Sequence, residues 1–427
     1  MSTGMSYQAS LLTKANEVFP GGVLGRHRLP DERAVVITRG QDAHLFDAEG
    51  REYIDFTCGG GTLLLGYTNR EVTEAINNQL EKGIHFLALV NDVAIEYAAD
   101  LLKVIPCGDQ VRLACTGSEA TFKALRLARA FTHRNKILKF EGAYHGNHDY
   151  AMWSYNKSIT GDYPKPLANT AGMPASIADE ILIAPYDDFD TTAQIIRQYQ
   201  NDLAAVIVEP VQRMCGPSPG FLENLRVITE KLGIVLIFDE AVTGFRLALG
   251  GAQEHYGVLP DLAVYGKAVG AGLPLSAVAG REDIMQLCDP RIWNEESRAV
   301  YFSGTLYGNS VSVAAAHAFL KVVRKPGIYP AFFEKVEFLK QGLREIINRR
   351  GIAAQVLGEG PLWHLVFTDT SEAVTDKERL MLFHYNLIDE GVFVRPGGGH
   401  FFSMAHTNAD ITTTLEKVDS VLARMFG

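Results

Sequence analysis

Cysteine is scarce in this chain, and its placement excludes two kinds of stabilising site. Of 427 residues only five are cysteines, an odd number, scattered without any C-x-x-C pair: Cys58, Cys107, Cys115, Cys215 and Cys288. Disulfide frameworks and zinc sites need cysteines at paired or regular spacing. We therefore expect buried free thiols in a reducing compartment.

The sequence has neither a basic excess nor a long apolar run. Its formal net charge is −10 at pH 7, whereas nucleic-acid binding needs basic patches that meet phosphates. No apolar run approaches the roughly 18 residues of a membrane span, and the first residues, MSTGMSYQAS, lack the basic-then-apolar order of a signal peptide. We expect a cytoplasmic protein that binds neither nucleic acid nor membrane.

What the sequence does have is a hydrophobic share of 47%, arranged in short apolar runs that alternate with helical patterns. The clearest case comprises a strand at 203–210, a helix at 225–233 and a second strand at 234–240. Short apolar runs bounded by glycine and proline, with helices between them, predict a mainly parallel sheet flanked by helices.

The pattern of apolar and charged residues changes near residue 325. An amphipathic helix at 331–350, a strand at 361–367 and a closing helix at 409–426 follow. We therefore predict an α/β protein with a large central domain and a smaller α+β domain built from both ends of the chain. The expected divisions are 1–62 for the N-terminal segment, 63–325 for the large domain and 326–427 for the C-terminal part.

Two charged residues stand at the ends of expected strands. Asp239 closes the apolar run IVLIF, at the edge where α/β sheets bind ligands; a helix cap or structural ion pair is the alternative. Lys267 follows a short strand and precedes a glycine-rich loop. Burial lowers a lysine's pKa and frees its amine for a Schiff base, whereas the alternative is a lysine whose ammonium group reaches the surface.

Two further stretches have features of a ligand site. In LACTGSEATFKALRLARA (113–130) a short strand, a Thr-Gly-Ser-Glu turn and a long helix favour a phosphate cup that includes the Ser118 hydroxyl; a plain capping box is the alternative. In FEGAYHGNHDY (140–150) Tyr144 follows a strand and would stack on a flat ring, unless the loop is merely packed. His145 and His148 have no accompanying carboxylate or cysteine pattern, so we expect no metal.

The order of these pieces is more informative than each piece alone. A phosphate cup, a ring aromatic, a buried aspartate and a lysine are the parts that pyridoxal 5′-phosphate (PLP) needs. Asp239 would keep the pyridinium nitrogen protonated, so that the ring accepts the electron pair released when a Cα proton leaves. Lys267 would carry that proton as a general acid–base.

At these motifs the sequence resembles the class III (fold type I) PLP-dependent aminotransferases over nearly its whole length. The branch that it resembles most is that of glutamate-1-semialdehyde 2,1-aminomutase and of β-amino-acid aminotransferases such as β-phenylalanine aminotransferase. The matching stretches follow the family's order: PGGVLGRHRLP (20–30), DAEGREYIDF (47–56), the long run at 116–146, VEPV (208–211), FDEAVTGFR (238–246), PDLAVYGKAVGAGLPLSAVAG (260–280), GTLYGN (304–309) and AHT (405–407).

The resemblance implies a role for each matched position. Lys267 would hold the cofactor, and Asp239 would pair with its pyridinium nitrogen. Tyr144 would stack on one ring face and Ala241 would pack on the other, more loosely than the valine or isoleucine of many members. The other implied cofactor residues are Gly117 and Ser118 at the phosphate, His145 and Glu209 in the pocket, and Thr305 at the phosphate of the neighbouring subunit of a two-fold dimer.

The C-terminal loop separates two activities of this branch. GGGHFFSMAHT (397–407) aligns with a mutase stretch resembling FEAGFTSLAHT, so the mutase glutamate becomes Gly398 and Arg395 replaces a small polar residue. In β-phenylalanine aminotransferase an arginine in this loop binds the substrate carboxylate, a task that suits the guanidinium fork; a surface arginine is the alternative. Arg28 aligns best with the mutase arginine that grips a carboxylate, and Arg26 is its rival.

We therefore expect a homodimeric transaminase with shared active sites. It would move an amino group from a donor, a β-amino acid or related ω-amine, to a 2-oxo acid by a ping-pong mechanism. A mutase-like isomerase and a catalytically silent binding protein remain alternatives. Three glycines after Arg395 favour a mobile loop that would swing the arginine. The loops expected to shape the pocket are 57–67, 85–92, 150–175 and 395–403.

Overall fold

The computed structural model describes residues 6–87, 89–156, 161–292, 299–368 and 376–427. Of the expected pocket loops, residue 88 and residues 157–160 therefore lie outside the described residues. The chain forms two compact units, which we call the small unit (Met1–Asn69 with Pro330–Gly427) and the large unit (Arg70–Tyr329). The borders after Asn69 and Tyr329 fall a few residues beyond the expected borders after residues 62 and 325.

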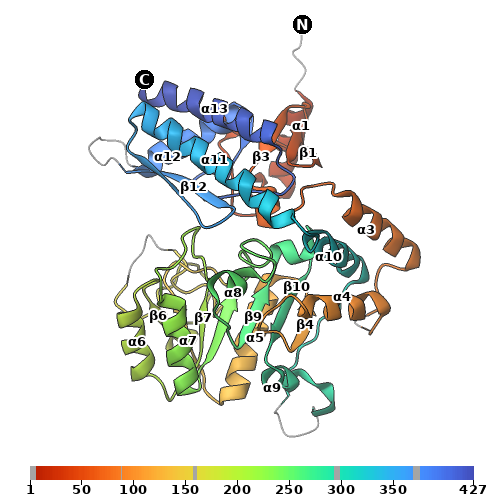
Figure 1. Ribbon diagram of the computed structural model, residues 1–427, viewed down its shortest axis with the longest axis vertical. Coiled ribbons are helices and arrows are strands. Elements are labelled where there is room, and N and C mark those ends of the chain that lie inside the picture. Colours follow the sequence, from red (N-terminus) through yellow and green to blue (C-terminus); the bar gives the residue numbers. More distant parts are fainter. Residues whose placement is uncertain (1–5, 88, 157–160, 293–298, 369–375) are drawn as a thin grey trace. The chain divides into compact units, whose positions relative to one another are not determined.

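The large unit contains a seven-stranded sheet with the order β4-β10-β9-β8-β7-β5-β6 (Figure 1). The strands β5 to β9 run parallel to one another, and β10 runs antiparallel to β4 and β9. The α/β fold with a mainly parallel sheet is thereby confirmed. The strand bounds are β4 Gln110–Ala114, β5 Lys136–Phe140, β6 Ile181–Ala184, β7 Leu203–Val208, β8 Val235–Asp239, β9 Leu262–Tyr265 and β10 Ser276–Gly280.

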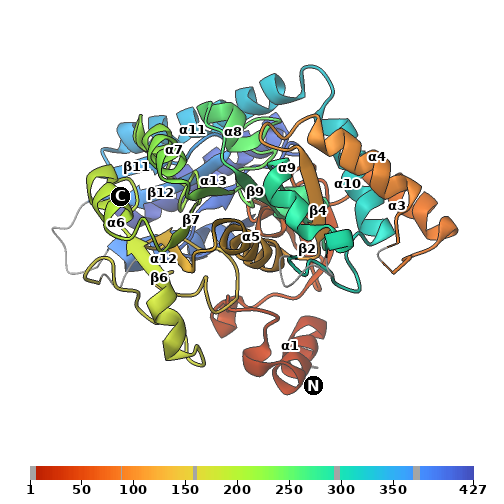
Figure 2. The same cartoon turned by 90° about the horizontal axis from the view of Figure 1, so that it is seen from below.

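Helices cover both faces of this sheet, which explains the unbroken apolar runs of its strands. Alternate residues of each strand enter opposite cores: Ile137 packs with α5, whereas Leu138 packs with α6 and α7. Figure 2 shows α5 on the other side of the strands from α7. The helices of this unit are α3 Arg70–Lys82, α4 Asp92–Leu102, α5 Gly117–Thr132, α6 Phe189–Gln198, α7 Phe221–Leu232, α8 Gly251–Tyr256, α9 Glu282–Met285 and α10 Ser310–Val323.

In the small unit, a short strand pairing helps to join the two ends of the chain. Its four-stranded sheet has the order β1-β2-β3-β13, and β13 (Val392–Phe393) pairs parallel with β3 (Glu52–Asp55). A second sheet has the order β11-β12-β14. The remaining elements are α1 Tyr7–Val18, β1 Ile37–Gln41, β2 His44–Asp47, α2 Cys58–Gly61, α11 Ile328–Arg350 (most of which belongs to this unit), β11 Ala354–Leu357, β12 Leu362–Phe367, α12 Asp376–Asp389, β14 His400–Phe401 and α13 Asn408–Phe426.

The cysteines differ from expectation in their burial. All five are free thiols, but only Cys58 and Cys288 are buried, and Cys215 is exposed. The expectation of buried thiols was wrong for Cys215 because it lies on a surface turn that bridges to Gln212 after β7. Across the described residues we find no helix that combines the length and the apolar character needed to cross a bilayer.

Candidate active site

The expected cofactor residues of the large unit gather at one edge of its sheet. Asp239 ends β8, Lys267 follows β9, Glu209 follows β7, and Tyr144 and His145 lie in the loop after β5. Because β9, β8, β7 and β5 are consecutive neighbours in the sheet, their carboxyl ends meet at the edge where α/β folds bind ligands.

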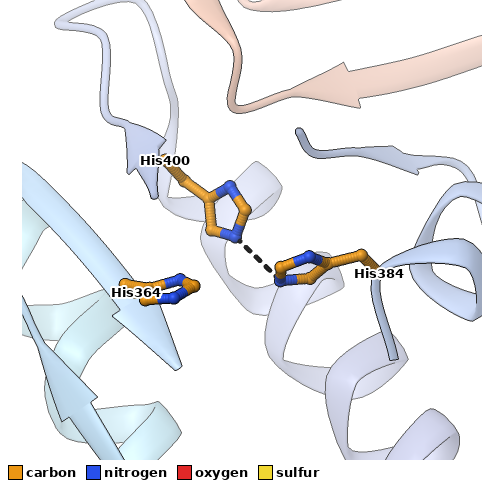
Figure 3. A group of neighbouring side chains, drawn as sticks. All are labelled: His364, His384 and His400. Carbon is orange, nitrogen blue, oxygen red and sulfur yellow. Dashed lines mark hydrogen bonds between the residues drawn. The ribbon is translucent and has the colours of Figure 1, made fainter. Parts of the chain in front are cut away.

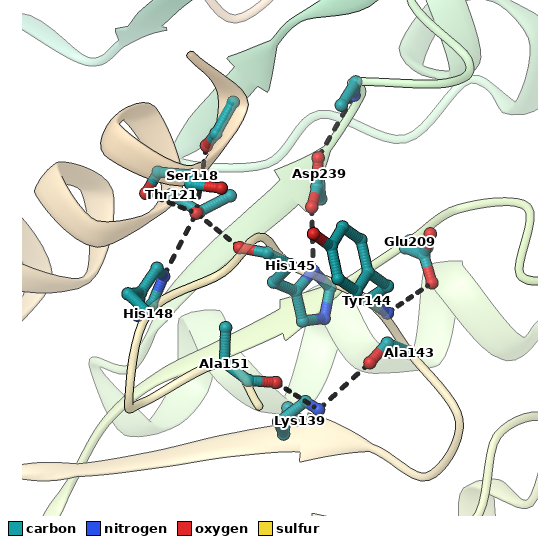
Figure 4. A network of polar contacts seen from close by, with 12 residues as sticks. Ser118, Thr121, Lys139, Ala143, Tyr144, His145, His148, Ala151, Glu209 and Asp239 are labelled. Atoms are coloured by element: carbon teal, nitrogen blue, oxygen red, sulfur yellow. Dashed lines mark hydrogen bonds and ion pairs between the residues drawn. The ribbon is translucent and has the colours of Figure 1, made fainter. Parts of the chain in front are cut away.

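Asp239 is buried and held from two sides. Its Oδ2 lies 2.8 Å from Nδ1 of His145, and its Oδ1 accepts a hydrogen bond from the backbone N–H of Ala241 at 3.1 Å. Figure 4 shows His145 directly beneath the carboxyl group. The side chain of His145 is also buried. This contact fits the structural ion-pair alternative for Asp239, and it is equally compatible with a carboxylate that faces a cofactor.

Tyr144 presents an aromatic face beside this carboxylate. Its side chain is 44% exposed, large for a residue that directly follows buried Ala143. Its backbone N–H donates to Oε2 of Glu209 at 3.1 Å, and burial raises the pKa of the Glu209 carboxyl. The loop is therefore fixed through its backbone while the ring stays accessible, as stacking on a flat cofactor requires.

Lys139 supports the same loop and was missed in the sequence. Its buried ammonium donates to the carbonyl oxygens of Ala143, Ala151 and Trp153 at 3.0, 2.9 and 2.6 Å. Figure 4 shows the contacts with Ala143 and Ala151. Burial lowers the pKa of Lys139 to about 7. A lysine inside the strand KILKF, at a position flanked by apolar residues, was the available signal, because lysine is seldom buried without partners.

The turn between β4 and α5 is a capping box whose geometry also suits an anion. Thr116 accepts from the N–H of Glu119, and the Glu119 carboxylate accepts from the N–H of Thr116. Gly117 and Ser118 begin the helix, so their N–H groups have no partner within it. The Ser118 hydroxyl also accepts from the N–H of Asn147 at 2.8 Å. The capping alternative is therefore present, and it leaves the first two helical N–H groups for a phosphate.

Lys267 lies next to this turn. It is half-buried and adopts φ 50°, a left-handed conformation uncommon for a side chain other than glycine. A Cβ added to the preceding Gly266 would lie 3.4 Å from Cβ of Ala241 and 3.7 Å from Cα of Gly117. The strand end that bears the lysine is thus adjacent to the phosphate turn and to the alanine expected against the ring.

Thr305 lies on the surface of the large unit, in the loop before α10. It is exposed, and its carbonyl oxygen is 2.7 Å from Nε2 of His85. The side chain of Asn309 donates to the carbonyl of Ile84 at 3.2 Å. The loop of Thr305 is therefore joined to the segment near residue 85.

The expected substrate arginines all belong to the small unit, but they differ in surroundings. Burial, then Arg395, then Arg26 lower the pKa of His27, so both arginines lie near that imidazole. Arg28 instead pairs with Asp31 at 2.6 Å, with both side chains exposed. A Cβ at Gly398 would overlap the guanidinium of Arg395, which is therefore packed over that glycine.

The group at the sheet edge fits PLP. A half-buried lysine, a buried carboxylate, an accessible aromatic ring and an anion-binding helix N-terminus meet the needs of its aldehyde, its ring nitrogen, its ring face and its phosphate. With the seven-stranded sheet, this set defines a PLP-dependent enzyme of fold type I.

Comparisons with known proteins identify the family. The sequence model of the family described as Aminotransferase class-III matches residues 28–425. A curated relative, glutamate-1-semialdehyde 2,1-aminomutase of Thermomicrobium roseum, is 37% identical over 435 residues, which cover 99% of each chain. The chain belongs to the class III aminotransferases, as the resemblance in its sequence indicated, and it is an enzyme of the PLP-dependent aminotransferase type.

Solved structures of transaminases share this fold. An ω-transaminase from Sphaerobacter thermophilus superposes with a TM-score of 0.91 at 30% identity, covering 100% of this chain and 99% of that one. A transaminase with PLP bound gives 0.91 at 27% identity, with 98% and 97% covered. A β-phenylalanine aminotransferase from Variovorax paradoxus gives 0.84 at 29%, with 97% and 93% covered.

Proposed function

We propose that this enzyme is a transaminase that takes the amino group of a β-amino acid or related ω-amine and passes it to a 2-oxo acid. The observation that carries the proposal is the packing of Arg395 over Gly398. At position 398, where the resemblance places a glutamate in the mutase, any side chain would displace the guanidinium of Arg395. The loop is therefore built to present an arginine, the side chain best suited to a carboxylate.

The groups at the sheet edge supply the common chemistry. PLP, when bound, holds the substrate nitrogen and accepts an electron pair from the carbon that loses its proton. In this proposal Asp239, backed by His145, keeps the ring nitrogen protonated. The amine of Lys267 takes the proton from one carbon and returns it to another. Gly117 and Ser118 hold the phosphate, while Tyr144 and Ala241 orient the ring.

For a second carboxylate contact we favour Arg26 over Arg28. The charges of Arg26 and Arg395 both lower the pKa of His27, so Arg26 is the arginine that shares an electrostatic environment with Arg395. Two neighbouring arginines would allow the site to accept the two carboxylates of an acceptor such as 2-oxoglutarate, with one arginine sufficing for a monocarboxylate donor.

We further propose a homodimer in which Thr305 reaches the partner's cofactor. Apolar side chains are exposed on both sides of the His85–Thr305 contact, at 64% for Ile84, 65% for Leu87 and 56% for Leu306. Contiguous exposed apolar surface marks interaction sites, and this surface lies on the loop that carries the expected phosphate contact.

The isomerase remains the second candidate, because the curated relative at 37% identity is an aminomutase. The substrate preference of Arg395 variants separates the two. In the transaminase account, Arg395→Ala weakens a β-amino acid donor about a hundredfold in kcat/KM, since a charge-assisted bidentate contact is lost, and leaves an otherwise similar amine without a carboxylate nearly unchanged. Equal loss on both donors would remove Arg395 from the proposal.

A further inference from the structure

Three histidines of the small unit converge outside the cofactor site. His364 in β12, His384 in α12 and His400 in β14 each place one ring nitrogen within 4.8 Å of the other two (Figure 3). His384 and His400 are buried, and His364 is half-buried. Three imidazoles are a set that binds zinc, so the positions of their protons decide what the cluster does.

Burial favours the neutral form of all three rings. Burial lowers the pKa of His384 to about 3 and that of His364 to about 4, and it lowers the pKa of His400 as well. The charge of Arg395 lowers each pKa further, and the rings of the cluster oppose one another's protonation. Each ring therefore has one N–H and one lone pair.

The backbone fixes which nitrogen of His384 carries its proton. The N–H of Gly397 donates to Nδ1 of His384 at 3.0 Å, so this nitrogen has the lone pair and Nε2 has the hydrogen. Nε2 of His384 then donates to Nε2 of His400 at 3.2 Å. The hydrogen bonds run in one direction, from Gly397 through His384 to His400.

This direction opposes a metal site. A metal-bound histidine donates its outer N–H to a carbonyl or carboxylate, whereas the outer nitrogen of His384 faces a donor and its inner nitrogen is protonated. Among the described residues, Nδ1 of both His364 and His400 has no partner within hydrogen-bonding distance, so neither ring has the outer acceptor of a metal ligand.

The chain of hydrogen bonds begins at Gly397, on the loop that carries Arg395. This loop connects β13 to β14, and the N–H of Gly398 donates to the carbonyl of Arg395 at 3.1 Å. Gly397 has φ 67°, and a Cβ there would lie 3.0 Å from Sδ of Met381, one turn before His384 on α12. Helix α12 therefore holds the glycine turn under the guanidinium of Arg395 through the hydrogen bond from Gly397 to His384.

We propose that His384 is a positioning residue for Arg395: by accepting the N–H of Gly397 it fixes the glycine turn over which the guanidinium packs. The proposal rests on the carboxylate-binding role proposed for Arg395. Three consecutive glycines have much conformational freedom to lose, and the buried acceptor offsets part of that cost. His400 keeps His384 in the required tautomer, and the low pKa of His384 preserves its lone pair.

The test compares three variants of the PLP-loaded enzyme. In His384→Asn the side-chain Oδ1 lies close to the position of Nδ1 and can accept a hydrogen bond from the N–H of Gly397. In His384→Gln the side-chain acceptor lies at the position of Nε2 instead. In His384→Leu the side chain has no acceptor. We expect Leu and Gln to raise KM for a β-amino acid about tenfold, the scale of one buried hydrogen bond, with kcat and the carboxylate-free amine unchanged. The KM of His384→Asn for the β-amino acid should stay within about twofold of that of the parent enzyme.

Failure of this proposal is distinct from failure of the proposed function. If Arg395→Ala has no selective effect on the carboxylate donor, the proposed function fails first. If that effect is present, three results would overturn the positioning role. The His384 variants would affect both donors equally, would have no effect on either donor, or would weaken activity further in the Arg395→Ala enzyme. A rise in melting temperature of the EDTA-treated parent on addition of zinc chloride, absent in His364→Ala, would replace it with a metal site.

Discussion

At the scale of single residues, the cofactor site depends on side chains fixed by buried hydrogen bonds. Asp239 is bonded to His145 and to the backbone of Ala241, so its carboxyl group cannot turn away from the ring position. Asp239→Asn preserves the shape but cannot stabilise a protonated ring nitrogen. We expect kcat to fall about a thousandfold, within the range of acid–base contributions, while absorption of bound PLP is retained. An enzyme that keeps its kcat would contradict the assigned role.

Lys139 allows a stability prediction on the same strand. Lys139→Met leaves three buried carbonyl oxygens without their donor, and each unsatisfied buried acceptor costs on the order of 1 kcal/mol. We expect the free energy of unfolding of the large unit to drop by about 3 kcal/mol in urea melts. Lys136→Met on the half-buried start of β5 is the control and should cost less than about 1 kcal/mol. Equal effects would show that Lys139 does not support the loop.

Sequence reasoning proposed Asp239 and Lys267 because each stands in a local pattern, a charged residue at the end of an apolar strand. It did not locate Lys139 or His384 as supports. Their partners are backbone groups of distant loops, Ala151 and Trp153 in one case and Gly397 in the other. A backbone N–H or carbonyl has no sequence signature, so only the folded chain reveals these contacts.

At the scale of elements, the helices and strands expected at 203–210, 234–240, 331–350, 361–367 and 409–426 lie within a few residues of the observed bounds. The expected helix at 225–233 begins earlier, at Phe221, because Phe221 and Leu222 are also buried in the core. The pairing of β13 with β3 was not predicted. β13 has two residues, too few to show alternation, and its partner lies near the other end of the chain.

A contact between β2 and α13 predicts how the small unit responds to pH. The hydrogen bond from His44 to Asp410 raises the pKa of His44 above its usual value near 6.5. Protonated His44 therefore stabilises the folded state below that value, and the contribution is lost as pH rises through the raised folded pKa. We expect the melting temperature of the small unit to decline across that interval.

His44→Gln is the variant for this measurement, because it keeps a polar side chain but does not titrate. Its melting temperature should lie below that of the parent at acidic pH and approach it at alkaline pH. Parallel curves for the two proteins would show that the His44–Asp410 contact makes no contribution that depends on pH.

At the scale of the whole molecule, the exposed apolar surface around the His85–Thr305 contact predicts the oligomeric state. Leu87→Asp together with Leu306→Asp should convert the proposed homodimer to a monomer in light scattering and weaken PLP retention, since Thr305 would no longer meet a partner. Val227→Asp changes a comparably exposed residue, at 64%, on α7 of the large unit and should leave the dimer intact. A parent protein that is already monomeric would contradict the shared site.

The family, the fold class and the cofactor followed from the sequence because its motifs occur in a fixed order along a single α/β pattern. In the proposed function, the choice between transferase and mutase depends on one loop, in which Gly398 leaves room for Arg395. Sequence alignment placed both residues there, but their contact is visible only in the structure.

The most direct measurement is the absorption spectrum of the PLP-loaded enzyme after a β-amino acid is added without any 2-oxo acid. We predict that the band of the lysine-bound cofactor falls, that the band of the aminated cofactor rises, and that a 2-oxo acid then restores the first band. A spectrum unaffected by β-amino acids, together with conversion of glutamate-1-semialdehyde in the absence of any 2-oxo acid, would contradict the transaminase account and establish the isomerase.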